Sequence, residues 1–249
     1  ILCFGLFTWA LSGSWISSFA SQQTIRVGTK AFTEQYILGE LIGQWIESQK
    51  DVSVVQIPSL GSTIAFDALK DDQIDFYIDY TGTIWATIMN RDEFVGRGRV
   101  LQEVQDYLLS QHGIRLVSHL GFENTYALSM RRDRATELSI QNISDLSLLS
   151  PSMRIGADIE FFSRNEWGSL VSIYGLHFKK RLSMDPGLMY QAVHLREVDV
   201  VSAFSTDGRI DSYDLVMLKD DKSAIPPYDA ILLASPGVSK REPDLLKSL

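Results

Sequence analysis

The sequence predicts an α/β protein of two lobes with a hinge and a cleft between them. From residue 24 onward, short apolar runs alternate with amphipathic stretches, a pattern that indicates parallel strands joined by crossover helices. Two successive sets of this kind follow one another, which indicates two lobes. With 249 residues, of which 45% are apolar and 22% are charged, the chain is long enough to bury a sizeable core.

The first set places one aromatic residue at the edge of its sheet. The expected elements are a strand at 25–28, a helix at 33–49, a strand at 52–57, a helix at 61–69, a strand at 74–79, a helix at 100–110 and a strand at 115–121. The apolar positions that share one face of the first helix are Ile37, Leu38, Leu41, Ile42, Trp45 and Ile46. Ser62 is the expected cap of the second helix. The third strand ends just before Tyr80, at the carboxyl edge where open α/β sheets bind ligands.

The second set begins after residue 121 and sets the expected lobe boundaries. Its elements are strands at 126–130, 153–157 and 198–204, helices at 166–174 and 188–196, later apolar runs at 215–218 and 230–234, and a helix starting near 243. We expect the chain to cross between the lobes near 119–124 and near 208–214. Lobe 1 is therefore predicted to hold residues 24–120 and 214–249, and lobe 2 residues 121–213.

Composition excludes several classes of function. The net charge of −8 argues against nucleic-acid binding, which needs a basic face. No glycine-rich nucleotide motif occurs, and the single cysteine, Cys3, excludes an internal disulfide or a cysteine metal cluster. The four histidines are scattered without the spacing of metal ligands. We expect no metal and no cofactor.

Four tyrosines each lie at the end of a different predicted element. They are Tyr80, Tyr126, Tyr190 and Tyr213. For any one of them, a half-buried core residue with a wet hydroxyl is the simpler interpretation. A set of ring faces, however, suits a permanently methylated ammonium, because that cation cannot donate a hydrogen bond and is held by the ring quadrupoles.

Six short motifs occur around these tyrosines in a fixed order. They are KAFTEQ at 30–35, LGST at 60–63, YTGT at 80–83, NTYA at 124–127, STDGRI at 205–210 and PPYDA at 226–230. As an ordered set, they resemble the substrate-binding proteins of ABC-type osmoprotectant importers, which take up glycine betaine, choline or carnitine. The resemblance runs from about Ile25 to the last residue. It implies the fold of a type II periplasmic binding protein, which closes on its ligand by a hinge motion.

The resemblance also implies a set of ligand-binding residues. The aromatic cage of the family carries over to the four tyrosines, and Lys30 and Thr83 match family positions that meet a ligand carboxylate. Arg164 is the expected carboxylate partner from the second lobe, and Asn124 is expected to help shape the cage. For Arg164, a surface residue or a structural ion pair is the competing interpretation; for Asn124, an ordinary turn residue. Trp167 departs from the glycine usual in the family, so it could reshape the cleft.

The function that this resemblance implies is capture of a quaternary ammonium compound, without catalysis. The expected partners are an ABC permease and, through it, a cytoplasmic ATPase, and the binding domain is expected to be monomeric. An enzyme acting on methylated amines is an alternative, although no nucleophile elbow or metal-ligand pattern occurs. Two further alternatives are the effector domain of a transcription regulator and a receptor for ergothioneine, a larger betaine.

The first 20 residues are almost wholly apolar, and the first charged residue is Arg26. Residues 1–23 fit a secretory signal peptide. They also fit the last membrane span of a permease fused ahead of the binding domain, since 20 apolar residues can cross a bilayer. Under either interpretation, the chain from Ser21 onward is expected in the periplasm or at the outer face of the cytoplasmic membrane.

Overall fold

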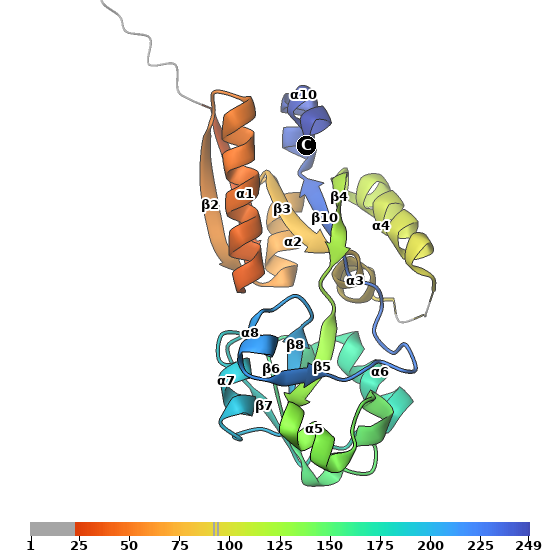
Figure 1. Cartoon of the computed structure of the whole chain (residues 1–249). Helices are drawn as coiled ribbons and strands as arrows, with labels where there is room; N and C mark the ends of the chain where they lie inside the picture. The colour runs from red at the N-terminus through yellow and green to blue at the C-terminus, as the bar shows by residue number, and fades with distance from the viewer. Residues whose placement is uncertain (1–22, 92, 94) are drawn as a thin grey trace, which may run out of the picture.

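The computed structural model describes residues 23–91, 93 and 95–249. They form two lobes, each built on a five-stranded mixed sheet, which lie one above the other in Figure 1. The prediction of a two-lobed α/β fold is therefore confirmed. The predicted apolar leader lies outside the described residues. Within the described part of the chain, no helix has both the length and the apolar character needed to cross a bilayer.

Lobe 1 holds both ends of the described chain. Its elements are β1 (Thr24–Lys30), α1 (Thr33–Gln49), β2 (Ser53–Leu60), α2 (Ser62–Lys70), β3 (Phe76–Tyr80), α3 (Thr81–Thr83), the π-helical turn η1 (Ile84–Ile88), α4 (Arg97–His112), β4 (Arg115–Glu123), β10 (Asp229–Ala234), α9 (Pro236–Arg241) and α10 (Pro243–Ser248). The strand order is β2-β1-β3-β10-β4. Strands β1, β2 and β3 are parallel, and β10 runs antiparallel between β3 and β4.

The sheet of lobe 1 is covered on both faces. On β10, Ile231 and Leu233 pack with α2 and α4, whereas Leu232 and Ala234 pack with the cluster that includes α1, α9 and α10. Because both faces are buried, β10 is a continuous apolar run from Ala230 to Ala234 rather than an alternating one. This arrangement holds Tyr80 rigidly at the carboxyl end of β3.

Helix α1 meets the sheet through only part of the predicted face, since Leu38, Ile42, Trp45 and Ile46 pack against the core but two other predicted residues do not. Its bounds match the prediction, but Ile37 and Leu41 are 56% and 57% exposed. The buried positions include Gly39 and Gly43, where an added Cβ would lie 2.3 Å from Thr29 and 2.9 Å from Gln56. The two glycines let the helix approach the sheet closely. The rotation of the helix about its own axis is therefore set by its small residues as well as by its large ones.

Lobe 2 is a separate sheet inserted between β4 and β10. Its elements are β5 (Tyr126–Arg131), α5 (Arg132–Leu138), η2 (Ile143–Leu146), η3 (Ser150–Ser152), β6 (Arg154–Ala157), the 3-10 turn η4 (Phe161–Ser163), α6 (Asn165–Tyr174), β7 (Lys180–Ser183), α7 (Met189–His194), β8 (Val200–Phe204), α8 (Arg209–Ser212) and β9 (Leu215–Met217). The strand order is β7-β6-β8-β5-β9. The short strand β7 was absent from the prediction, because its sequence is mostly polar and exposed.

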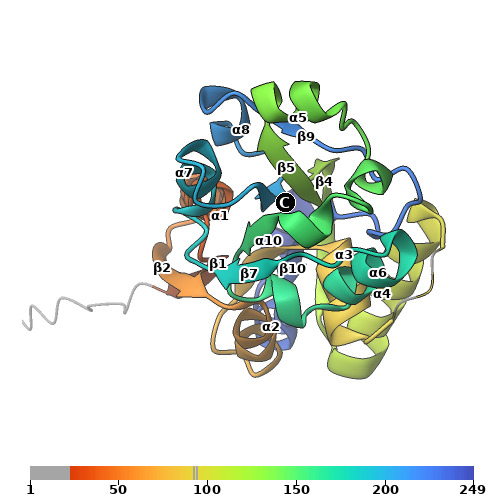
Figure 2. The same cartoon turned by 90° about the horizontal axis from the view of Figure 1, so that it is seen from below.

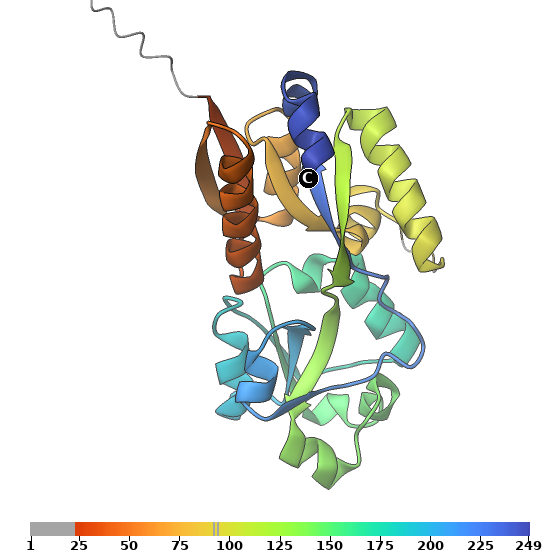
Figure 3. The same cartoon turned by 45° about the horizontal axis from the view of Figure 1, so that its top comes forward.

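Two crossings join the lobes, and the second lies later than predicted. The first is at 124–125, as expected. The second was placed at 208–214, but β9 pairs antiparallel with β5 and so belongs to lobe 2, which moves the crossing to 218–228. The two crossings run side by side, since the Asn124 amide donates to the Tyr228 carbonyl. Figure 3 shows both segments passing between the lobes.

The lobes also touch across the cleft, away from the hinge. Seen from below, α6 of lobe 2 overlaps α3 of lobe 1 (Figure 2), and it contacts the turn η1 that follows α3. Asn165, the first residue of α6, donates from Nδ2 to the carbonyl oxygen of Ala86 in η1 at 2.8 Å. Hydrogen bonds therefore join the lobes both here and at α1, where the Thr206 hydroxyl of lobe 2 donates to Glu34.

Candidate functional site

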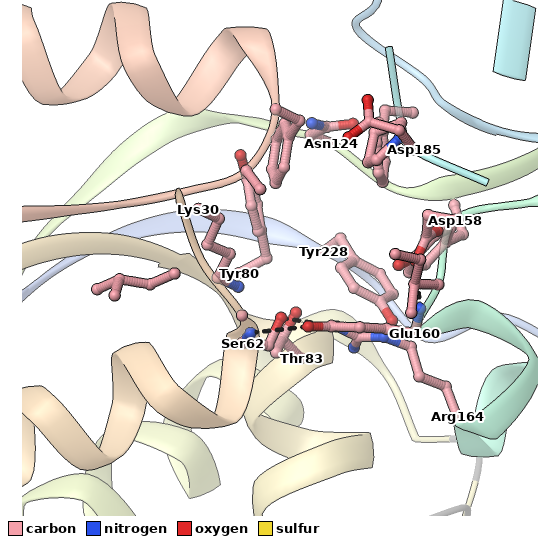
Figure 4. Close-up of a pocket in the computed structure, with 18 residues that line it drawn as sticks. Lys30, Ser62, Tyr80, Thr83, Asn124, Asp158, Glu160, Arg164, Asp185 and Tyr228 are labelled. Atoms are coloured by element: carbon pink, nitrogen blue, oxygen red, sulfur yellow. Dashed lines mark hydrogen bonds and ion pairs between the residues drawn. The ribbon is translucent and has the colours of Figure 1, made fainter. Parts of the chain in front are cut away.

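A cavity of about 260 Å³ lies between the lobes, at the carboxyl end of β3. It is smaller than the usual site for a drug-sized ligand, so it suits a small molecule. Figure 4 shows residues from both lobes converging on it. The residues that line it are Lys30, Ala31, Phe32, Leu60, Gly61, Ser62, Tyr80, Thr83, Asn124, Tyr126, Asp158, Ile159, Glu160, Arg164, Asp185, Pro186, Phe204 and Tyr228.

Five aromatic rings form a continuous arc along this cavity. Their order by contact is Tyr80, Phe32, Phe204, Tyr126 and Tyr228. The centroids are 6.3 Å apart between the first two rings and then 4.7, 5.4 and 6.0 Å apart along the arc. Lobe 1 supplies Tyr80 and Phe32, lobe 2 supplies Phe204 and Tyr126, and the second crossing supplies Tyr228. We call this set the aromatic arc.

Hydrogen bonds at their outer ends fix two rings of the aromatic arc. The Tyr80 hydroxyl donates to Glu34 and accepts from Gln35 Nε2 at 3.0 Å, and the Tyr228 hydroxyl donates to Glu166. Burial raises the pKa of Tyr80 and of Tyr228 well above the ordinary value. Both hydroxyls therefore stay neutral and hydrogen-bonded to a protein carboxylate. The ring faces, rather than the oxygens, are left to contact a ligand.

Tyr126 is held in the arc by packing. It is 7% exposed and contacts Phe161 as well as its two neighbours in the arc. Burial raises the pKa of its hydroxyl well above the ordinary value. The Arg164 guanidinium lies 5.5 Å from its ring centroid, so one protein cation already stands near this ring.

Two of the four predicted cage tyrosines do not line the cavity. Tyr190 is fully buried in lobe 2, where its hydroxyl accepts from the Phe204 amide at 3.0 Å. The Arg209 guanidinium covers the Tyr190 ring at 4.4 Å, a place that a ligand cation would otherwise take. Tyr213 packs its ring on His194, with the centroids 5.0 Å apart. Tyr190 thus stands one layer behind Phe204.

Lys30, Thr83 and Asn124, which the resemblance implies as ligand-binding residues, all line the cavity. Lys30 is buried, and its ammonium group is paired with the buried carboxylate of Asp79. Burial lowers the pKa of Lys30, against the opposing charge of Asp79. Asn124 donates from Nδ2 to Glu34 at 2.9 Å, so Glu34 ties the first crossing to the Tyr80 hydroxyl.

Arg164 also lines the cavity, but it is already paired. Its Nη2 atom donates to Glu160 Oε2 at 2.5 Å and to the Ser62 hydroxyl at 2.7 Å, while Nη1 donates to Thr87 at 3.1 Å. Glu160 Oε1 accepts from the Ser62 amide at 3.0 Å. The prediction that Ser62 caps α2 is wrong, because Gly61 holds the cap position. The carboxylate at this end of the helix comes from Glu160 of lobe 2.

Trp167 lies outside the cavity lining. It is 8% exposed and packs against Phe161, Phe162 and Phe178 in lobe 2. The tryptophan thus supports the turn η4, which stands between Glu160 and Arg164. Its effect on the cleft is indirect, through the position of that turn.

Sequence reasoning missed three rings of the arc and one carboxylate. Phe32 and Tyr228 lie inside two of the six motifs, so a search for every aromatic residue in those motifs would have found them. Phe204 directly precedes a third motif. Glu160 gave no signal, because its partner Ser62 is 98 residues away along the chain. In the described part of the chain, no group of three or more His, Cys, Asp or Glu side chains could hold a metal ion.

The chain is similar to known transport proteins over most of its length. Residues 23–249 match the family model described as the substrate binding domain of ABC-type glycine betaine transport systems. The carnitine transport binding protein OpuCC of Listeria monocytogenes is 32% identical over 230 residues, which cover 91% of this chain and 75% of that protein. The ergothioneine transport permease/ergothioneine binding protein EgtU of Helicobacter pylori is 29% identical over 248 residues, which cover 98% of this chain but 44% of that protein.

A solved structure shares the two-lobed fold. It is described as a glycine betaine/carnitine/choline ABC transporter and superposes with a TM-score of 0.70 at 26% identity. The match covers 89% of this chain and 83% of that one. The similarity therefore extends through both lobes and both crossings.

Proposed function

Since this chain belongs to the family of substrate-binding domains of ABC-type glycine betaine transport systems, we propose that it captures a small quaternary ammonium compound between its lobes for an ABC permease. The observation that carries this proposal is the aromatic arc, which lines a small cavity with rings from both lobes. A methylated ammonium has no hydrogen to donate, so ring faces are the partners that hold it best.

The arc binds a cation only when the lobes are together. Each cation–π contact contributes roughly 0.5–2 kcal/mol, depending on desolvation. Rings from two lobes lie within contact distance of one another, as Phe32 and Phe204 do at 4.7 Å. Opening the hinge would separate such pairs, so a bound cation stabilises the closed form by contacting both lobes.

The direct ligand contacts that we propose are the five rings of the arc, with Thr83 and Asn124 beside them. Tyr190 acts by supporting Phe204 through its hydroxyl, and its ring is covered by Arg209. Lys30 and Arg164 set the charge of the cavity wall, each through its own carboxylate partner. This assignment differs from the cage inferred by resemblance at Tyr190 and Tyr213.

Among the candidate ligands, glycine betaine, choline and carnitine share the trimethylammonium group that the arc would hold. Ergothioneine carries the same group, and a protein named for binding it is among the relatives. For that reason ergothioneine is the alternative ligand in this class. It is larger than the other three compounds and would therefore occupy more of the cavity.

The function requires partners that accept the ligand. We propose that the domain acts outside the cytoplasmic membrane as a monomer and docks on a permease whose transport is driven by a cytoplasmic ATPase. Closure sets the relative position of the two lobe surfaces, so ligand binding and docking are thermodynamically linked. The family is one of transport proteins, and we propose that this chain has no catalytic activity of its own.

Calorimetric titration of the purified protein tests the proposal. Glycine betaine, choline, carnitine, proline betaine and ergothioneine are titrated separately, and the samples are then checked for turnover products. Saturable binding of at least one, with no product, is the expected result. Uptake of the same compounds is then measured in cells that lack other osmolyte importers, with and without this chain. Unchanged uptake of all of them would remove the transport assignment.

A further inference from the structure

A second cavity lies beside the aromatic arc, between α1 and the segment that leads into α8. Its volume is about 270 Å³, close to the 260 Å³ of the first cavity. Phe32, Asn124 and Phe204 line both cavities, so the stacked rings of Phe32 and Phe204 form part of a shared wall. We call the second one the side cavity. By volume, it accepts a compound of the size that the first cavity accepts.

Apolar side chains form one part of the side cavity. Phe122 of β4 adds a third phenylalanine ring to the shared pair, and Ile37 and Leu38 of α1 also line the cavity. Ile37 is 56% exposed, so solvent reaches the cavity beside α1. An isoleucine that the sequence placed in the core therefore lies at a hollow of the surface. Phenylalanine rings suit a methylated ammonium there for the same reason as in the aromatic arc.

The charge of the side cavity is negative. The carboxylates of Glu34 and Asp207 line it, and none of its described lining residues is basic. Asp207 is paired with Arg209. Glu34 instead accepts hydrogen bonds from a tyrosine hydroxyl, a side-chain amide and a threonine hydroxyl, all of which are uncharged groups. These bonds hold the Glu34 carboxylate in place without neutralising its charge, so a cation beside it would be stabilised.

Asn124 supplies a hydrogen-bond acceptor at the shared wall. Its Nδ2 group donates to Glu34 at 2.9 Å, whereas its Oδ1 atom is buried and has no partner within the described part of the chain. A buried acceptor is unfavourable unless a ligand or a water molecule donates to it. The hydroxyl of choline is such a donor. The side cavity thus combines aromatic rings, a carboxylate and an acceptor, which together match a quaternary ammonium alcohol.

We propose that the side cavity is a second and weaker site for a quaternary ammonium cation such as choline, with Glu34 as its counter-charge. This inference rests on the proposed function and adds a second site for the same class of ligand. The walls come from α1 and β4 of lobe 1 and from the segment 204–208 of lobe 2, so the site is complete only when the lobes are together. With three rings instead of five, it should bind choline at least about tenfold more weakly than the first cavity.

Two measurements on wild-type protein test the proposal. Calorimetric titration with choline should show two binding events per chain, a tight one and a weaker one. Crystals are also grown with arsenocholine, in which arsenic replaces the nitrogen of choline. Anomalous scattering should then locate arsenic at two positions in each chain, one in the first cavity and one beside Phe122 and Glu34. A side cavity that holds only water would show neither the weaker event nor the second arsenic position.

A pair of variants on α1 assigns the weaker event to the side cavity. Ile37→Lys places a positive charge in its lining and should weaken that event at least about tenfold, because like charges repel. Leu41→Lys makes the matched change at a residue that is 57% exposed on the same helix and lines neither cavity, so it should leave the weaker event unchanged. Because Ile37 does not line the first cavity either, the tight event should change by less than about twofold in both variants.

The outcomes separate this inference from the proposed function. If choline binds once per chain and arsenic lies only in the first cavity, the second site is excluded while the proposed function stands. Arsenic in the side cavity without a second calorimetric event would mean binding at crystal concentration only, which also overturns the inference. Equal weakening of the second event by Ile37→Lys and Leu41→Lys would place that event elsewhere, and the inference fails. If no quaternary amine binds wild-type protein, the proposed function itself fails. The wild-type measurements are decisive even if a variant does not fold.

Discussion

The aromatic and charged ends of the cavity differ in which of their groups remain available. In the aromatic arc, the hydroxyls of Tyr80 and Tyr228 are bound to protein carboxylates, and the rings line the cavity. At the charged end, Lys30 and Arg164 are each bound to a carboxylate of the protein. The first end therefore offers ring faces to a ligand, whereas at the second end the protein itself supplies a carboxylate partner to each cation. This difference indicates that binding free energy comes mainly from the ligand headgroup.

The largest expected effect is at the aromatic end. Tyr126→Ala should weaken choline binding at least about tenfold, because it removes a ring face and opens the arc between Phe204 and Tyr228. Tyr126→Phe should lose much less, since the ring is kept. Calorimetry measures both variants against wild-type protein. Equal losses for Ala and Phe would mean that the hydroxyl carries recognition, and the contrast between the two ends would disappear.

The next effect is at the charged end. Arg164→Ala leaves Glu160 without its guanidinium partner and removes contacts to Ser62 and Thr87 across the cleft. We expect choline and glycine betaine to weaken by the same factor, about fivefold, because the lost contacts hold the lobes together rather than the ligand. Arg134→Ala, on the surface of lobe 2, is the control. A loss confined to glycine betaine would show that Arg164 binds the ligand carboxylate directly.

A smaller effect is expected where the two lobes meet at the hinge. Glu34 accepts from the Tyr80 hydroxyl, from Asn124 and from the Thr206 hydroxyl, which belongs to lobe 2. Glu34→Gln cannot accept all three bonds as well, so affinity should fall about threefold through a less stable closed form. Glu40→Gln, on the exposed side of α1, is the matched control. No difference between these two variants would exclude a role for Glu34 in closure.

The smallest effect is expected at Tyr190. Tyr190→Phe removes the hydroxyl that accepts from the Phe204 amide but leaves the ring, which Arg209 already covers. Affinity should change by less than about threefold, the value of one neutral hydrogen bond. Thermal unfolding should register the lost bond as a modest decrease in Tm. A loss of affinity as large as that of Tyr126→Ala would return Tyr190 to the ligand cage.

Sequence patterns predicted the fold better than they predicted the site. The helix at 33–49 and the central strands followed from apolar periodicity, because that signal is local. The orientation of α1 did not, since it depends on how closely Gly39 and Gly43 approach the sheet. The second crossing was misplaced because the pairing of β9 with β5 is a long-range contact.

The site could be predicted only in part for a similar reason. Six of the eight ligand-binding residues expected from the sequence line the cavity, because the motifs lie at strand ends that the fold brings together. Contacts between distant segments decide which aromatic rings line the cavity. For example, the Arg209 guanidinium lies over the Tyr190 ring. The pairing of Glu160 with Ser62 depends on closure of two lobes, and no local pattern encodes it.

The central claim is that the aromatic arc recognises the positive charge of a methylated ammonium. The most direct test compares choline with its neutral carbon isostere, in which a tert-butyl group replaces the trimethylammonium group. The two compounds have nearly the same shape, so calorimetric titration of both isolates the contribution of the charge. Choline should bind at least about tenfold more tightly, as expected for several cation–π contacts. Equal affinity for the two compounds would contradict the account and reduce the arc to an apolar pocket.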